Sequence, residues 1–308
     1  LQNPLVQRLN IELSPGTAPG EAHMRADVTE GPQYSVGFQV ADDQSPTVGE
    51  VRGQVQGSVA NLYGYGDVLS ASYGHSEGLN DGSLQYSIPI FSDDTRVTVR
   101  YDRNGTLVVD PSLAPLNVTS DYTNVSLSVS RPFYRTPEQE LNLALDLDWR
   151  RAQSFLLGQP FPFTAGADAN GHTNVTALRF IQNWVDHGAD QALGLRSTFS
   201  VGLNILDATV EPALPGVPTA SGQFFSWLGQ AQYVRRIFGD WEAVVRSDIQ
   251  LANGPLFPIE QFALGGIDTV RGYRQYLVVT DDAFFASGEL RIPIGKVKVP
   301  YLSQDGDE

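Results

Sequence analysis

Apolar and polar residues alternate along most of the chain from Tyr34 onward, which is the period of a β-strand whose two faces have different surroundings. The clearest run spans residues 141–150, with four Leu and Trp149 on one face and Asn142, Asp146, Asp148 and Arg150 on the other. Similar runs occupy residues 51–59, 69–74, 83–90, 96–102, 125–130, 193–205 and 241–251. The pattern predicts an all-β, antiparallel protein.

Several of these runs are nine or more residues long, whereas strands of soluble sandwich proteins typically have about five or six residues. Tilted strands of this length cross a hydrocarbon layer, and a charged side chain facing lipid near its midplane costs several kcal/mol. The charged face must therefore surround a wet interior, so we expect a transmembrane β-barrel with a polar lumen. The polar side chains expected to line it are Arg96, Arg100, Asp146, Asp148, Arg150, Arg196, Glu242, Arg246 and Asp248.

The connections between the runs are of two kinds. Asn80–Gly82, Ser92–Asp94 and Phe238–Asp240 predict tight turns. Longer joins at residues 106–120, 157–171 and 207–221 are rich in Pro, Gly and Ala and predict surface loops. Aromatic residues near the strand ends are expected to form girdles at the two membrane interfaces, or to be ordinary strand aromatics of a soluble β protein. They are Tyr63, Tyr65, Tyr122, Tyr134, Trp149, Trp184, Trp227 and Trp241.

The amino-acid composition excludes some classes of protein and disfavours others. The 308 residues include no Cys, which excludes a disulfide framework and a Cys-ligated metal site. A net charge of −15 disfavours nucleic acid as a partner. No run approaches the length of a transmembrane helix.

No motif nominates an enzyme. Residues 74–78 match G-x-S-x-G, but a half-polar strand precedes them and turn residues follow, whereas a nucleophile elbow needs a buried strand and a helix. The four His have no metal-ligand spacing, and no phosphate-binding G-x-x-x-x-G-K-[ST] occurs. We therefore expect no catalytic residues, no metal, no cofactor and no nucleotide.

A long irregular segment at about residues 254–280 interrupts the strands. Phe262, Leu264, Ile267, Val270 and Tyr273 make it too apolar for a solvated linker, and its glycines permit a tight backbone path. This composition predicts a loop that folds back and packs its apolar side chains against other parts of the protein.

The loop carries a resemblance. Residues 270–273, Val-Arg-Gly-Tyr, resemble the signature of the polypeptide-transporting outer-membrane barrels, and Phe-Ala-Leu-Gly-Gly before them is similar to the two-partner secretion branch, the haemolysin and filamentous-haemagglutinin exporters. Further matching segments lie at residues 28–31, 61–70, 86–90 and 287–293 in the same order. The resemblance implies sixteen strands in the full protein, about twelve of them in this chain.

The resemblance also implies roles for residues of the loop. It makes Arg271 a buried cation at the loop tip, held by an acidic group of the inner wall, with Glu289 the nearest acid in this chain. The usual partner would lie just past residue 308. The loop would act as a plug or lever formed by Gly265, Gly266, Val270, Arg271, Gly272, Tyr273 and Arg274.

The domain organisation follows the same resemblance. Residues 1–30 are expected to be the remnant of the last periplasmic POTRA domain, with a disordered leader as the alternative, and residues 31–308 the barrel. The chain starts at Leu1 without a signal segment and ends in an acidic stretch, so we expect an interior fragment of a longer protein.

The function implied is secretion of an unfolded exoprotein through the bacterial outer membrane, with the cargo and outer-membrane lipid as partners. Two alternatives stay open at this point: a barrel-assembly insertase of the same superfamily, and a passive porin or surface adhesin.

Overall fold

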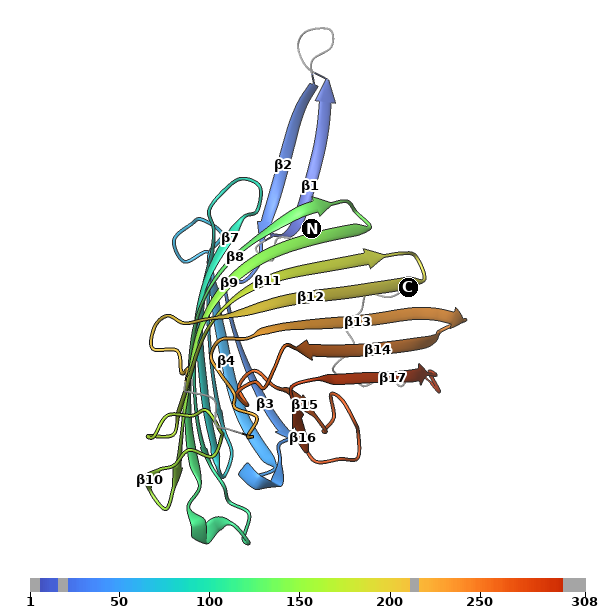
Figure 1. Cartoon of the computed structure of the whole chain (residues 1–308). Helices are drawn as coiled ribbons and strands as arrows, with labels where there is room; N and C mark the ends of the chain where they lie inside the picture. The colour runs from blue at the N-terminus through green and yellow to red at the C-terminus, as the bar shows by residue number, and fades with distance from the viewer. Residues whose placement is uncertain (1–5, 16–21, 211–215, 296–308) are drawn as a thin grey trace.

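One large antiparallel sheet dominates the computed structural model, which describes residues 6–15, 22–210 and 216–295. Its 13 strands follow the order β17-β14-β13-β12-β11-β9-β8-β7-β6-β5-β4-β3, with β10 paired to β9 beside this path. Figure 1 shows the sheet strongly curved around the loop that carries β15 and β16. The predicted all-β, antiparallel architecture is confirmed.

The sheet consists of β3 (Tyr34–Asp42), β4 (Val51–Ala60), β5 (Val68–His75), β6 (Leu79–Pro89), β7 (Arg96–Leu107), β8 (Thr119–Arg135), β9 (Gln139–Leu156), β10 (Gln159–Pro160), β11 (His172–His187), β12 (Gln191–Leu203), β13 (Phe225–Phe238), β14 (Trp241–Ala252) and β17 (Ala283–Arg291). Two small hairpins complete the strands: β1 (Val6–Pro15) with β2 (Ala22–Glu30), and β15 (Phe262–Leu264) with β16 (Val278–Thr280). Two single-turn 3-10 helices, Pro46–Val48 and Ala114–Leu116, lie in connections. None of the helices in the described ranges could span a membrane.

Strand register divides the wall into two faces. Leu145 of β9 lies opposite Val129 of β8 and Phe180 of β11, and all three side chains are more than 40% exposed. The neighbouring row joins Asp146 to Ser128 and Arg179. We call the first, apolar face the outer face; the second is the inner face, because the loop between β14 and β17 contacts it. Sequence alternation correctly separated these two faces.

One of the aromatic residues near the strand ends does not lie on the face that was expected from the sequence. Tyr134 and Trp184 stack on the outer face with ring centroids 6.2 Å apart, and Phe238 packs edge-on against Trp241 at 6.4 Å. Tyr122 was expected in an outer girdle, which is wrong. It shares the inner face with Asn124 and lines an inner-wall cavity, because it lies an odd number of residues from the outward Val125.

The short turns also follow the sequence, with one correction. The chain reverses at 76–78, and the predicted turn Asn80–Gly82 belongs to β6. The Gly78 N–H donates to Val48 O at 2.9 Å, and its carbonyl accepts from Leu107 N at 2.7 Å. A Cβ at Gly78 would lie 2.2 Å from Leu107 O, so the crowded junction of three connections fixes the turn there.

At the other end of the wall, the β4–β5 turn is organised by a buried carboxylate. Asp67 is 0% exposed; its Oδ1 accepts from Tyr63 N at 3.1 Å and its Oδ2 from the Tyr86 hydroxyl at 3.2 Å. Burial works to raise the pKa of Asp67, but the backbone N–H of Tyr63 and the Tyr86 hydroxyl outweigh it and hold the pKa below its usual value. The carboxylate thus holds Tyr63 and Tyr65 outward, 68% and 71% exposed.

The N-terminal hairpin projects from the wall (Figure 1). Its strands β1 and β2 pair with the register Ile11 to Ala26, as two alternating runs around a turn would. The turn residues fall outside the described part of the chain. That this hairpin is the end of a POTRA domain remains a prediction.

We expect the two faces to respond oppositely to a new charge. Leu145 lies on the outer face and Ala144 beside it on the inner face, near Asp146. If the outer face contacts lipid, Leu145→Arg should cost about 2–4 kcal/mol and lower the assembled fraction of the full-length protein. Ala144→Arg should be tolerated. Heat-modifiable migration on gels measures both, and equal losses would contradict the assignment of the faces.

A second prediction concerns Asp67. Because its pKa is depressed in the folded protein, its contribution to stability is complete above about pH 4 and disappears as pH falls through the lower folded-state pKa. Asp67→Asn should therefore lower the unfolding temperature of the full-length protein at neutral pH and narrow its difference from wild type in acid. Asp240→Asn in the exposed β13–β14 turn is the control. A difference that stays constant with pH would refute the linkage.

Candidate functional site

The inner face gathers the charged side chains that alternation selected. Arg100 lies opposite Ser126, which lies opposite Asp148, and Arg196 lies opposite Gln230, which lies opposite Asp248. The same register places the remaining predicted lining residues on this face: Arg96, Asp146, Arg150, Glu242 and Arg246. Their role as a lumen lining stays a prediction.

A loop between β14 and β17 crosses this face. Its β15–β16 hairpin pairs Phe262 with Thr280, and the residues between form a closed turn. Thr269 Oγ1 accepts from Gly265 N at 2.8 Å, and Gly266 N donates to Tyr273 O at 3.1 Å. These bonds bring the chain back on itself directly beside residues 270–273.

Glycine is required at the start of this turn. Gly265 and Gly266 have φ angles of 113° and 92°, which L side chains rarely adopt. A Cβ on Gly265 would also lie 2.2 Å from Arg274 O. The two glycines quoted from the sequence are thus explained by backbone geometry.

The loop root is fixed to the wall by buried charges. Arg179 of β11 is 9% exposed, and its Nη2 donates to both carboxylate oxygens of Glu260 at 2.8 Å. Its Nε donates to Asp148 Oδ2 at 2.6 Å and its Nη1 to Ser200 Oγ at 2.7 Å. Arg150 Nη1 reaches Glu260 Oε1 at 3.2 Å. We call Asp148, Arg150, Arg179 and Glu260 the root cluster.

Apolar side chains bury the same root. Leu256 and Phe257, each 1% exposed, pack with Val175 and Ala177 of β11 and with Phe224 after the β12–β13 loop. The loop is therefore anchored by apolar side chains at its root, through Leu256 and Phe257, which are not the residues that the sequence analysis named as anchors. Ile267 and Tyr273, two of the expected anchors, are each 61% exposed.

The loop tip is held more weakly. Arg271 Nη2 donates to Glu289 Oε1 of β17 at 2.6 Å, but the Arg271 side chain is 65% exposed. The expectation of a buried cation at this position is wrong for the described structure; the buried cation is Arg179. Glu289 also contacts Arg291 at 3.5 Å, so two guanidinium groups share it.

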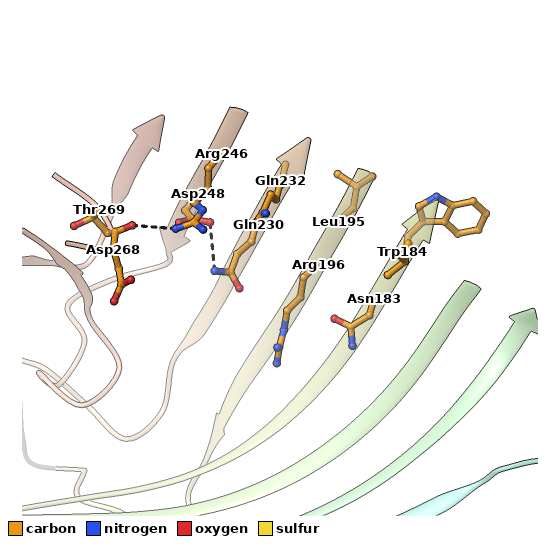
Figure 2. A pocket seen from close by; sticks show the side chains of 13 residues that line it. Asn183, Trp184, Leu195, Arg196, Gln230, Gln232, Arg246, Asp248, Asp268 and Thr269 are labelled. Carbon is orange, nitrogen blue, oxygen red and sulfur yellow. Dashed lines mark hydrogen bonds between the residues drawn. The ribbon is translucent and has the colours of Figure 1, made fainter. Parts of the chain in front are cut away.

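A cavity of about 470 Å³ separates the tip from the wall. Figure 2 shows Arg246 reaching from β14 toward Asp268 of the loop, with Gln230 and Arg196 on the neighbouring strands of the lining. Arg246 Nη1 donates to Asp268 O at 3.3 Å, and Gln230 Nε2 to Asp248 Oδ1 at 3.3 Å. The lining offers hydrogen bonds and both signs of charge.

The charge of Arg274 influences one carboxylate in the β7–β8 loop. The Ser112 hydroxyl and N–H hold the pKa of Asp110, in the β7–β8 loop, below its usual value, and the positive charge of Arg274 adds to this effect. Val270 is half-buried, whereas Gly272 and Arg274 are exposed.

Sequence reasoning missed Glu260 and Arg179. Glu260 lies in irregular chain, where no period marks a buried carboxylate. Arg179 does follow the alternation, between the outward Leu178 and Phe180, but Val175, Ala177 and Ile181 on its own face are apolar and mask the signal. Arg179 could have been identified as a single charged residue between apolar neighbours on the inner face.

Comparison with known proteins adds a family and a fold. The model of the haemolysin secretion/activation protein family ShlB/FhaC/HecB matches residues 20–305. The structure is similar to CdiB from Escherichia coli, with a TM-score of 0.82 and 18% identity over 96% of this chain and 55% of that one. It is also similar to CdiB from Acinetobacter baumannii, with a TM-score of 0.72 and 17% identity over 95% of this chain and 54% of that one.

A BamA structure from Haemophilus ducreyi that lacks POTRA domains 1–3 gives a TM-score of 0.58 and 12% identity, over 99% of this chain and 60% of that one. The chain thus spans little more than half the length of these solved relatives. No curated protein sequence matches it significantly. These likenesses show the outer-membrane β-barrel fold.

The two ion pairs of the loop should differ in strength. Removing one partner of a buried pair leaves an uncompensated charge, so Glu260→Ala should destabilise the full-length protein by about 3–5 kcal/mol. Glu289→Ala, the matched control at the exposed pair, should cost about 0–1 kcal/mol. Denaturant unfolding in detergent micelles measures both. Equal costs would show that the root cluster does not fix the loop.

Proposed function

Because the chain belongs to the haemolysin secretion/activation protein family ShlB/FhaC/HecB, we propose that it forms part of an outer-membrane pore that secretes a large, unfolded exoprotein in two-partner secretion. The observation that carries the proposal is the loop fixed to a charged inner wall. Such a loop occupies the path that a cargo chain would take, so its position can set access to the pore.

The inner wall suits an extended polypeptide. Its early strands present Ser35, Ser58, Ser70, Ser72 and Ser83 in successive rows, and later strands add Arg and Asp of both signs. A cavity of about 550 Å³ lies along the serine-rich rows. Hydroxyl and amide groups can exchange hydrogen bonds with a passing backbone.

The loop combines a fixed root with a weakly held tip. Buried, multiply hydrogen-bonded charges resist separation, whereas an exposed ion pair contributes about 0–1 kcal/mol. The Arg271–Glu289 contact can therefore break while the Glu260–Arg179 contact remains. The loop then acts as a lever with two positions of its tip, in which Arg271, Gly272 and Tyr273 move together.

The energy for transport would come from the cargo. The sequence holds no nucleotide-binding motif, so folding of the exoprotein outside the cell would drive its passage. The family is one of secretion proteins and not a class of enzymes. Its match favours neither an assembly insertase nor a passive porin.

Secretion of a co-encoded cargo by the full-length protein tests the proposal. At matched outer-membrane levels, Arg271→Ala should lower secretion by up to about fivefold, because the tip loses an exposed contact with Glu289 worth about 0–1 kcal/mol. The exchange Arg271→Glu with Glu289→Arg should restore a large part of it.

Arg291→Gln is the matched control, since it removes the other guanidinium that contacts Glu289 and leaves the loop intact. Its secretion should stay close to wild type. Unchanged export by Arg271→Ala, or general defects in envelope assembly in place of a secretion defect, would overturn the proposed function.

A further inference from the structure

Arginine side chains on the outer face are exceptions to its apolar character. Register places four there among the described strands: Arg103 on β7, Arg131 on β8, Arg151 on β9 and Arg235 on β13. Arg131 and Arg235 lie toward the strand ends that carry the tight turns. Arg103 and Arg151 lie at the opposite end, next to the long loops.

Arg103 and Arg151 form one site. Arg103 lies opposite Thr123, and Thr123 lies opposite Arg151, so the two residues share a row two strands apart. Two strand spacings amount to about 10 Å, a gap that two long side chains can close around one small anion. The next row holds Tyr101 and Trp149, which begin the apolar surface.

Neither guanidinium is neutralised. Arg131, at the other end, pairs with Asp93 at 3.1 Å. In the described chain, by contrast, neither Arg103 nor Arg151 forms an ion pair, although the exposed Asp121 lies one row nearer the loops. The single polar side-chain contact shown for either is Arg151 Nη2 to His172 Nε2 at 2.6 Å.

His172 orients Arg151 through a hydrogen bond. A guanidinium only donates, so His172 Nε2 must accept, and the ring proton then lies on Nδ1, which is 3.1 Å from Asp168 Oδ2. The imidazole therefore uses one donor position of Arg151. Arg151 is exposed, so its remaining N–H groups can donate to a ligand at the outer face.

The distance of the Arg103–Arg151 row from the other end of the strands shows where the row lies relative to the apolar band. Arg151 is ten residues from Leu141, which lies opposite Trp184, the partner of Tyr134 in the stacked aromatic pair. Ten residues rise about 33 Å along a strand, which at a tilt of about 45° spans roughly 25 Å, the height of the apolar band of such barrels. Arg103 and Arg151 thus lie at the edge of the apolar band that is next to the long loops, where lipid headgroups begin.

We propose that Arg103 and Arg151 bind the phosphate of a phosphorylated outer-leaflet lipid of the outer membrane. Guanidinium groups match phosphate oxygens bidentately, and the charge that is unpaired in the protein is complementary to such a headgroup. The acyl chains of the lipid lie against the apolar surface below. Leu206, 59% exposed and joined to Trp149 Nε1 through its carbonyl at 3.2 Å, extends that surface.

Lipid A binding to the purified full-length protein tests the site. After removal of co-purified lipid, lipid A carrying both phosphates is titrated in detergent and counted by native mass spectrometry. The double variant Arg103→Gln with Arg151→Gln should bind it at least tenfold more weakly than wild type. Lipid A stripped of its phosphates should bind both proteins equally weakly.

Arg131→Gln with Arg235→Gln is the matched control, because it removes the same charge from the outer face at the opposite end; its affinity should stay within twofold of wild type. Heat-modifiable migration verifies that every variant is assembled. Equal losses in the two double variants would show non-specific attraction and overturn the site. Inorganic phosphate that binds as tightly as lipid A would show an anion site and overturn the lipid assignment.

Discussion

The hydrogen-bond register between neighbouring strands determines on which face of the wall each strand side chain lies. Because side chains alternate with a period of two, a slip of one residue in any ladder would turn its charged row toward the apolar side. Long, unbroken ladders such as β8 to β9 and β9 to β11 prevent such a slip over many consecutive pairs. The inner charges, the outer apolar band and the row of Arg103 and Arg151 are three results of one register.

The same wall supports the loop with two very different strengths. At the root, Glu260 is enclosed by Arg179, Arg150 and the apolar cluster around Phe257. At the tip, the polar contacts are exposed and shared, and the cavity beside Arg196 leaves space for movement. The proposed lever requires rigidity at one end and freedom at the other, and both follow from how deeply each ion pair is buried.

Much of this arrangement could be predicted from the sequence because the period of two is a strong signal. It separated the two faces and selected nine inner-face charges correctly. Tyr122 was misplaced because residue type was given more weight than parity. The tight turn expected at Asn80–Gly82 was wrong because contacts with Val48 and Leu107, distant in sequence, fix the reversal at 76–78. Glu260 could not be found because irregular chain has no period, and Arg179 was hidden by apolar neighbours that bury the loop root.

The root cluster also has a consequence for charge balance. Arg150 and Arg179 carry two positive charges, and Asp148 and Glu260 supply two negative ones, of which Glu260 alone comes from the loop. Within this cluster the three wall residues alone carry a net charge of +1, and the loop supplies the counterion. Without Glu260 this charge would be left uncompensated in a buried site, so the position would attract another carboxylate.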